Sequence, residues 1–159
     1  MAEFLLNNQA LKEAGDLKKV SSTAEYPLGY TVKTIDENNE MREYMYVKCG
    51  VTVTAKDVSV IGPNFQTYAP VTSAYAVLGS VANIDVTSGE FYFAQIKGKT
   101  TVVSAGNTTA GDYGKMANTA ETITSNSTTK AATIMCEILG TRTGGGDVAV
   151  RLSGMTSEI

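Results

Sequence analysis

The chain has 159 residues, of which 43% are hydrophobic and 18% charged, and its formal net charge is −3 at pH 7. This length suits one domain with a proper hydrophobic core and is too short for two. The charges are spread evenly and no apolar run reaches about 18 residues, so we expect neither nucleic-acid binding nor a membrane span. The N-terminus lacks a basic start followed by a long apolar stretch, which argues against a secretory signal.

Threonine and glycine are frequent and tryptophan is absent. β-Branched residues favour strands, and no long amphipathic helical pattern follows the first twenty residues. Short apolar segments recur at regular spacing with turn residues between them, which is typical of a β-sandwich or a small β-barrel. We therefore expect an all-β protein.

Residues 1–25 differ in composition from the rest and form the expected N-terminal arm. A short helix is predicted over Asn7 to Ala14, ending at Gly15. Such a helix of about two turns is marginal unless it packs on a surface. Two interpretations stay open: a frayed terminus, or an arm whose apolar residues contact a neighbouring subunit. Those apolar residues are Phe4, Leu5, Leu6 and Leu11.

The segments Tyr30 to Ile35 and Met41 to Cys49 predict a β-hairpin, because a polar, turn-rich loop of five residues joins them. Alternate residues of a strand share a face. One face of the second strand is apolar and the other is half aromatic, so we expect both faces to be covered.

Strands are also predicted at Val51 to Thr54 and Val58 to Ile61, before the turn residues that follow. Phe65 to Ala74 is interpreted as a loop, and Tyr75 to Ile84 fits either a strand or a short helix. The aromatic side chains of the loop either pack beneath it or form a contact surface, since tyrosine is favoured at interfaces. The candidate contact residues here are Tyr26, Phe65 and Tyr68.

We expect the domain to be organised around Phe91 to Asp112. Two strand-like runs, Phe91 to Lys97 and Lys99 to Ser104, meet at Gly98 and are interpreted as a hairpin. A loop rich in glycine, asparagine and threonine follows, and Gly111-Asp112 is interpreted as a turn.

The remaining segments predict further strands. Tyr113 to Ala117 and Glu121 to Thr124 are short and weak. Ala131 to Leu139 fits a helix or a buried strand by periodicity, and its β-rich surroundings favour the strand. Asp147 to Ser153 alternates clearly, with its apolar residues expected to point inward.

No catalytic constellation stands out. The chain has no histidine, the commonest general base and transition-metal ligand, so we predict no enzymatic activity and no metal or cofactor site. The glycine-rich run Thr141 to Gly146 lacks the Gly-Lys-Ser/Thr ending and the following helix of a phosphate-binding loop. Glu137 is expected to face outward. Cys49 and Cys136 are expected to be buried free thiols, while a disulfide between them stays open.

Turn and strand signals at four places together carry a family resemblance. They are Tyr26-Pro27-Leu28-Gly29, Tyr44-Met45-Tyr46-Val47-Lys48, the block from Gly89 through Gly98 and Val102 to Gly111-Asp112, and Ile138-Leu139-Gly140 with Asp147-Val148-Ala149-Val150-Arg151-Leu152. This pattern resembles that of the capsid decoration proteins of tailed bacteriophages, also called cement or head auxiliary proteins.

The resemblance implies a small β-sandwich or β-barrel-like (β-tulip-like) domain over residues 26–154, an N-terminal arm over 1–25 and a C-terminal tail over 155–159. It implies a structural virion protein that binds the exterior of a phage capsid and stabilises the shell by bridging its subunits. The implied partner is the major capsid protein, and the implied assembly is a homotrimer. The implied location is the capsid surface, after synthesis in the host cytoplasm. Two alternatives stay open: another virion component, such as a head–tail adaptor or tail protein, and a carbohydrate-binding β module whose tyrosines stack on sugars.

Overall fold

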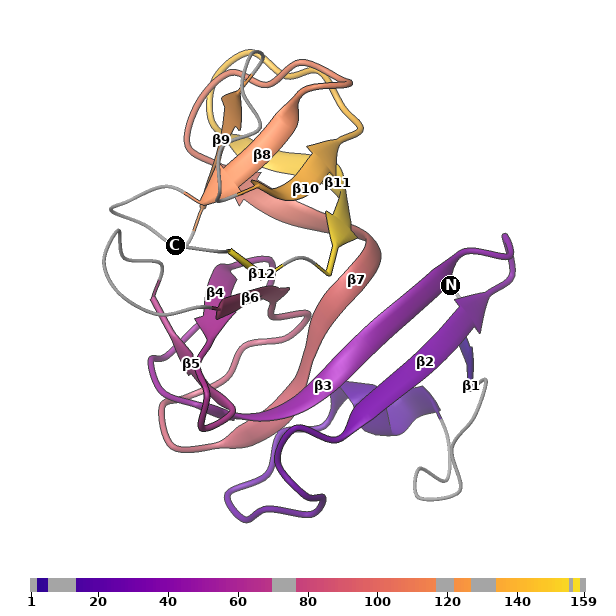
Figure 1. The fold of residues 1–159 in the computed structure, drawn as a ribbon, viewed down its shortest axis with the longest axis vertical. Coiled ribbons are helices and arrows are strands. Elements are labelled where there is room, and N and C mark those ends of the chain that lie inside the picture. Colours follow the sequence, from indigo (N-terminus) through magenta and orange to yellow (C-terminus); the bar gives the residue numbers. More distant parts are fainter. Residues whose placement is uncertain are drawn as a thin grey trace.

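The computed structural model describes residues 3–5, 14–69, 77–116, 122–126, 134–154 and 156–157. They form β-strands and one short 3-10 helix, so the expected all-β class is confirmed (Figure 1). No helix among these residues is long and apolar enough to cross a membrane. The elements are β1 (Glu3–Leu5), η1 (Ala14–Lys18), β2 (Thr31–Asp36), β3 (Met41–Cys49), β4 (Val58–Ile61), β5 (Gln66–Tyr68), β6 (Val77–Val81), β7 (Phe91–Ser104), β8 (Tyr113–Met116), β9 (Ile123–Asn126), β10 (Ile134–Ile138), β11 (Gly146–Ser153) and β12 (Thr156–Ser157).

The long strand β7 passes through both halves of the molecule (Figure 1). The hairpin predicted at Gly98 is wrong, because β7 continues through this glycine as one strand of 14 residues. Gly98 has a φ of +90°, which bends the strand without reversing it. Before the bend β7 pairs with β3, and after it with β11. A Cβ atom on Gly98 would overlap the carbonyl oxygen of Met41, so this crossing requires glycine.

The buried side chain of Gln95 stabilises the bend. Its Nε2 donates hydrogen bonds to the carbonyl oxygens of Lys97 and Lys99, each at 3.1 Å, on either side of Gly98. Its Oε1 accepts a hydrogen bond from Nδ2 of Asn83 at 3.0 Å. A buried carbonyl without a hydrogen-bond partner lowers stability, so Gln95 replaces the strand–strand hydrogen bonds that the bend disrupts.

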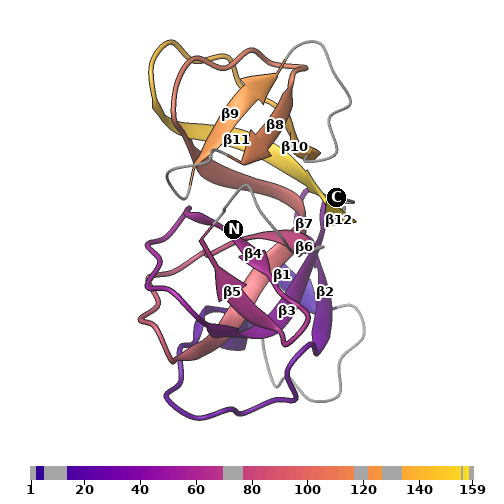
Figure 2. The same ribbon diagram turned by 60° about the vertical axis from the view of Figure 1, so that its left-hand side comes forward.

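Two closed rings of paired strands share β7, and we call them the first and second barrels (Figure 2). The first runs β3–β5–β4–β6–β7 and returns to β3. The second runs β7–β11–β10–β8–β9 and returns to β7. The parallel pairings β3–β5 and β7–β9 are short, with two and one residue pairs. The expected small barrel is thus present twice, built on one common strand.

The predicted hairpin of β2 and β3 is confirmed, with Ile35 opposite Met41 across the expected polar loop. Strand β1 pairs antiparallel with β2 on the side away from β3. The helix predicted over Asn7 to Ala14 lies outside the described residues except at Ala14, where η1 begins. Leu17 of η1 is buried in an aromatic cluster on the outer face of β3 and β7.

Other predictions have mixed outcomes. The ambiguous segments Tyr75–Ile84 and Ala131–Leu139 contain strands β6 and β10, as a β-rich chain favours. The strand predicted over Val51–Thr54 is wrong: Val53 makes only an isolated bridge, and a turn with Lys56 at a φ of +80° follows. The long loop predicted after β4 contains β5, and the expected C-terminal tail contains β12, which pairs with β6.

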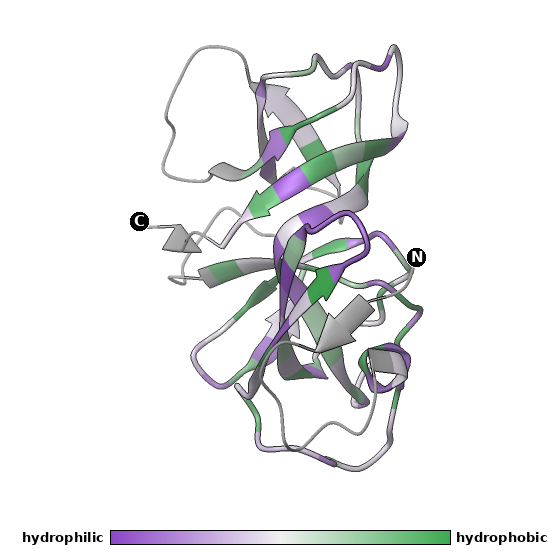
Figure 3. Cartoon of the chain, turned by 90° about the vertical axis from the view of Figure 1, so that its right-hand side faces the viewer, coloured by the Kyte–Doolittle hydropathy of each residue, from purple (hydrophilic) through white to green (hydrophobic). Residues whose placement is uncertain are grey.

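Alternation of polar and apolar residues along the strands separates the interior from the surface (Figure 3). The predicted inward residues of β11 are buried, and both cysteines are buried free thiols, as expected. The first barrel is filled by Val47, Cys49, Val53, Ile61, Ala82, Val86, Tyr92, Ala94 and Ile96. A separate cluster of Leu17, Val32, Tyr44, Tyr46 and Phe93 lies on the opposite face of β3 and β7, because alternate residues of a strand point to opposite faces. The second barrel is filled by Val102, Ile123, Cys136, Ile138, Val148, Val150 and Leu152, against which Val58 and Val81 of the first barrel pack.

Candidate functional site

An exposed apolar surface lies at one end of the first barrel. Leu28, Phe65 and Tyr68 are 38%, 38% and 40% exposed, and we call these three residues the turn patch. Leu28 and Phe65 come from two turns that touch, because the Phe65 ring lies over Gly29, where an added Cβ atom would come within 2.6 Å of it, and Tyr68 ends strand β5 just after the second turn. Grouped exposed apolar side chains are typical of interaction sites. The turn patch is therefore the candidate docking surface.

Backbone hydrogen bonds fix the first of these turns. The N–H of Tyr30 donates to the carbonyl of Pro27 at 3.1 Å, and Gly29 adopts a φ of +82°, which glycine tolerates. The N–H of Gly29 donates to the carbonyl of Tyr46 in β3 at 2.9 Å. The turn is thus anchored to the barrel, and Leu28 is presented at its tip.

The second turn holds Phe65 in a left-handed conformation, with a φ of +56°. Its N–H donates to the carbonyl of Gly62 at 2.9 Å, and its carbonyl accepts from the N–H of Lys48 at 3.0 Å. A left-handed non-glycine residue costs about 1–2 kcal/mol. Strain of this kind collects at functional sites, and here it accompanies an aromatic ring that is left in contact with solvent.

The other predicted contact residues lie elsewhere. Tyr26 is half-buried and packs in the core, with its ring centroid 5.2 Å from that of Tyr46 and 5.3 Å from that of Phe93. Phe4 and Leu5 belong to β1, whereas Leu6 and Leu11 lie outside the described residues. These positions remain predictions as contact residues.

The sequence interpretation missed Leu28, which it treated as part of a turn into the first strand. The available signal was an apolar residue between proline and glycine, at a turn tip where a polar residue is usual. The tyrosines considered for sugar stacking are mostly used in packing. Tyr44 and Tyr46 are buried, and Tyr26 stacks on Tyr30 with the ring centroids 6.0 Å apart.

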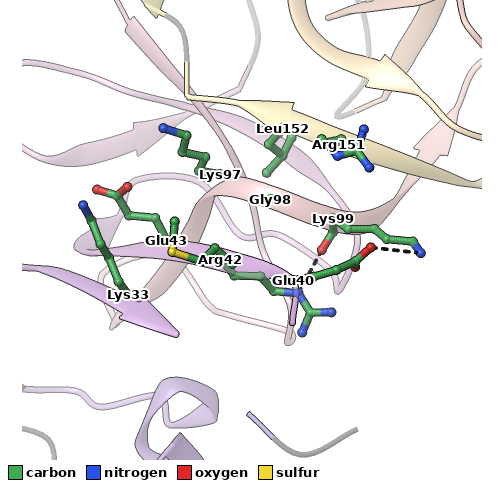
Figure 4. Close-up of a pocket in the computed structure, with 10 residues that line it drawn as sticks. Lys33, Glu40, Arg42, Glu43, Lys97, Gly98, Lys99, Arg151 and Leu152 are labelled. Atoms are coloured by element: carbon green, nitrogen blue, oxygen red, sulfur yellow. Dashed lines mark hydrogen bonds and ion pairs between the residues drawn. The ribbon is translucent and has the colours of Figure 1, made fainter. Parts of the chain in front are cut away.

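A charged hollow lies where the two barrels meet, and we call it the waist groove (Figure 4). It has a volume of about 260 Å³ and is floored by the bend at Gly98. Five cationic side chains line it, together with the acidic side chains of Glu40 and Glu43. The cations are Lys33, Arg42, Lys97, Lys99 and Arg151.

A second hollow of about 550 Å³ continues from the waist groove, because Arg42 and Lys99 line both. It adds the cations Lys18 and Lys56. Charge that is evenly spread along the sequence is therefore concentrated by folding. Sequence reasoning missed this site because its cations come from η1, β2, β3, β7, β11 and the turn before β4.

Asp36 positions one of these cations. Its Oδ1 accepts backbone hydrogen bonds from Asn38 at 2.9 Å and Glu40 at 3.0 Å, and its Oδ2 pairs with the guanidinium of Arg42 at 3.0 Å. The backbone hydrogen bond from Glu40, followed by that from Asn38 and by the nearby charge of Arg42, lowers the pKa of Asp36 below its ordinary value. Asp36 thus remains ionised and holds Arg42 at the groove.

The two buried thiols are poor nucleophiles. Burial raises the pKa of Cys136 to about 12 and also raises the pKa of Cys49, so both stay protonated at neutral pH.

No group of three His, Cys, Asp or Glu among the described residues could hold a metal ion. In the glycine-rich loop, Arg142 donates from Nε to the carbonyl of Gly145 at 3.0 Å, so a protein cation occupies that loop. Glu137 faces outward and pairs with Arg151 at 2.8 Å, as predicted.

Comparison with known proteins identifies a shared fold. No protein-family model matches the chain, and no curated protein matches it in sequence. Among solved structures, the chain is similar to the N base of the head fiber gp8.5 of bacteriophage phi29, at 16% sequence identity and a TM-score of 0.51. The similarity covers 73% of this chain and 98% of the head fiber base. At this identity the likeness shows a common fold alone.

Proposed function

We propose that this chain is a structural protein of a bacteriophage virion that binds the outside of the head. The observation that carries the proposal is the fold shared with the head fiber base, almost all of which is matched. The capsid decoration resemblance in the sequence points to the same class. The major capsid protein is the partner under this proposal, and the capsid surface is the location.

The turn patch supplies the contact with the head. Its apolar side chains are exposed on a rigid, hydrogen-bonded platform, which limits the entropy lost on binding. Several copies bound around a symmetry axis would multiply a weak single contact, and a homotrimer bridging capsid subunits is the assembly proposed. The role is non-enzymatic and needs neither nucleic acid nor membrane. The buried, protonated thiols support a non-enzymatic role, because such thiols are poor nucleophiles.

Binding to purified phage heads that lack the protein tests the proposal. We expect co-sedimentation with expanded heads to saturate at a fixed number of copies, and light scattering of the free protein to give the mass of a trimer. Phe65→Asn should weaken head binding at least about tenfold, which corresponds to about 1.4 kcal/mol. Asparagine tolerates the left-handed backbone, so this variant should remain folded.

Tyr113→Thr is the matched control, since it removes an aromatic ring that is 41% exposed on β8, away from the turn patch. We expect it to bind heads as the natural chain does. Absence of saturable binding to any head would overturn the proposed function. An equal loss in both variants would overturn the assignment of the turn patch. A glycan array checks the carbohydrate alternative, for which we expect no binding.

A further inference from the structure

The waist groove and its continuation concentrate positive charge in an acidic chain. Among the residues that the structure describes, seven lysines and arginines line the two hollows, against two acidic residues. The whole chain carries a net charge of −3, so the rest of the surface is strongly acidic. A hollow lined with one sign of charge raises the local concentration of ligands of the opposite sign.

Several of these cations are only weakly engaged within the chain. Lys99 lies 3.6 Å from Glu40, and Arg151 pairs with Glu137 while remaining half exposed. Exposed ion pairs contribute about 0–1 kcal/mol, so an incoming anion can replace them at small cost. Arg42 differs, since buried Asp36 fixes it.

Lys33 and Lys97 are the most available cations of the waist groove. They stand opposite Glu43 on the two strands that flank β3, and Figure 4 shows all three side chains on the same side of the sheet. Neither lysine makes an ion pair within the described part of the chain. One glutamate therefore faces two lysines, which leaves a local excess of positive charge. The spacing between strands separates the backbones at Lys33 and Lys97 by about 10 Å, so a ligand must carry its carboxylates at separate points to reach both lysines.

The composition of the groove favours carboxylates over a phosphate backbone. Glu40 and Glu43 lie among the cations and would repel a continuous row of negative charge, so the groove suits a ligand whose anionic groups are spaced, as in a mixed polypeptide sequence. Five of the seven cations are lysines, which lack the bidentate fork that suits phosphate. Among the described lining residues Tyr44 is the one aromatic side chain, and it is buried, so this part of the chain offers no exposed ring to stack on a base.

We propose that the waist groove binds an acidic polypeptide segment of a protein partner, with Lys33 and Lys97 holding carboxylates spaced along it. The segment lies across the bend of β7 and displaces Glu40 from Lys99. The proposal concerns the chemistry of the partner and does not depend on attachment to a phage head.

Fluorescence anisotropy with a labelled ten-residue peptide of alternating glutamate and serine tests this assignment. We expect saturable one-to-one binding that weakens steeply as salt rises. The double variant Lys33→Gln/Lys97→Gln should lower the affinity about tenfold, and Glu43→Gln should raise it severalfold by removing the competing carboxylate. Circular dichroism confirms that each variant is folded.

The matched control is Lys48→Gln/Lys115→Gln, which changes the net charge equally but lies outside both hollows. It should leave the affinity nearly unchanged. An equal loss of affinity in both double variants would mean that only the overall charge matters, and would overturn the assignment of the waist groove as the binding site. Equally tight binding of a ten-nucleotide thymidine strand would overturn the choice of polypeptide over nucleic acid. No measurable peptide binding at low salt would overturn the proposal outright.

Discussion

The two barrels share one strand but are filled in different ways. The first encloses the ring of Tyr92 and a set of buried polar groups, including the hydroxyl pair of Ser59 and Ser80 at 2.9 Å. The second is filled by aliphatic side chains and one thiol. An aliphatic interior is specified mainly by volume, whereas buried polar groups also require particular partners. The first barrel, whose interior contains the buried polar groups, also carries the turn patch.

The first way to test this comparison is to remove a large core side chain from each barrel. Ile61→Ala in the first and Ile138→Ala in the second should each lower the free energy of unfolding by about 2–5 kcal/mol. Because both barrels are built on β7, each variant should still unfold in one transition.

Urea titration followed by two probes checks this. Tyrosine fluorescence reports mainly on the first barrel, since Tyr113 is the only tyrosine among the described residues of the second, whereas far-UV circular dichroism reports on both. Coincident curves are expected. Separate midpoints in Ile138→Ala would show that the second barrel unfolds by itself, and the shared strand would not couple the two.

The bend that links the barrels can be tested with two glycines of nearly equal backbone angle. Gly98 and Gly111 have φ values of +90° and +91°, but only at Gly98 does an added Cβ meet other atoms. Gly111→Ala should cost about 1–2 kcal/mol for the left-handed backbone alone. Gly98→Ala should cost a further 1–3 kcal/mol, roughly, for the overlap with Met41. Equal losses in urea midpoint would contradict the close crossing.

Asp36, beside the first barrel, should make stability depend on acidity. Its pKa is lowered in the folded state, so the unfolded chain binds its proton more readily. The stabilisation is complete above the ordinary aspartate pKa of about 4 and is lost as the pH falls through the lower folded value. Asp36→Asn should therefore melt below the natural chain at pH 7, with a difference that shrinks toward pH 2. A difference in melting temperature that stays the same at every pH in that range would refute this role.

The smallest effect is expected at Tyr92, which is fully buried in the first barrel. Burial raises its pKa to about 12, partly offset by the hydroxyls of Thr67 and Ser59. Within the described part of the chain, no neighbour forms a hydrogen bond of normal geometry with the Tyr92 hydroxyl. Tyr92→Phe should therefore change the unfolding free energy by less than about 1 kcal/mol. A larger loss in urea titration would reveal a polar partner inside the first barrel.

Local patterns in the sequence predicted much of the fold. The β2–β3 hairpin and strand β11 follow from alternation that each segment carries alone. The bend at Gly98 could not be predicted, because a glycine between two strand-like runs is more often a turn. What keeps β7 continuous is its crossing over Met41 and the hydrogen bonds of Gln95, and neither is visible locally.

The candidate sites were less predictable for a related reason. Phe65 and Tyr68 were found because aromatic residues in a loop suggest contacts, but their neighbour Leu28 is 37 residues from Phe65 in sequence. In the waist groove, Lys33, Lys97 and Arg151 meet only after β2, β7 and β11 are assembled. Sequence charge patterns detect runs of like charge, and this site contains none.

Strand β7 also determines how the molecule would carry a mechanical load. It is paired with β3 through six residue pairs and with β11 through eight, all antiparallel. Tension along β7 would act on these two ladders in shear, so their hydrogen bonds would resist together and would not open one after another. A protein anchored through one barrel and pulled through the other would therefore transmit force along a single continuous backbone, through the bend that Gln95 and Met41 hold at Gly98.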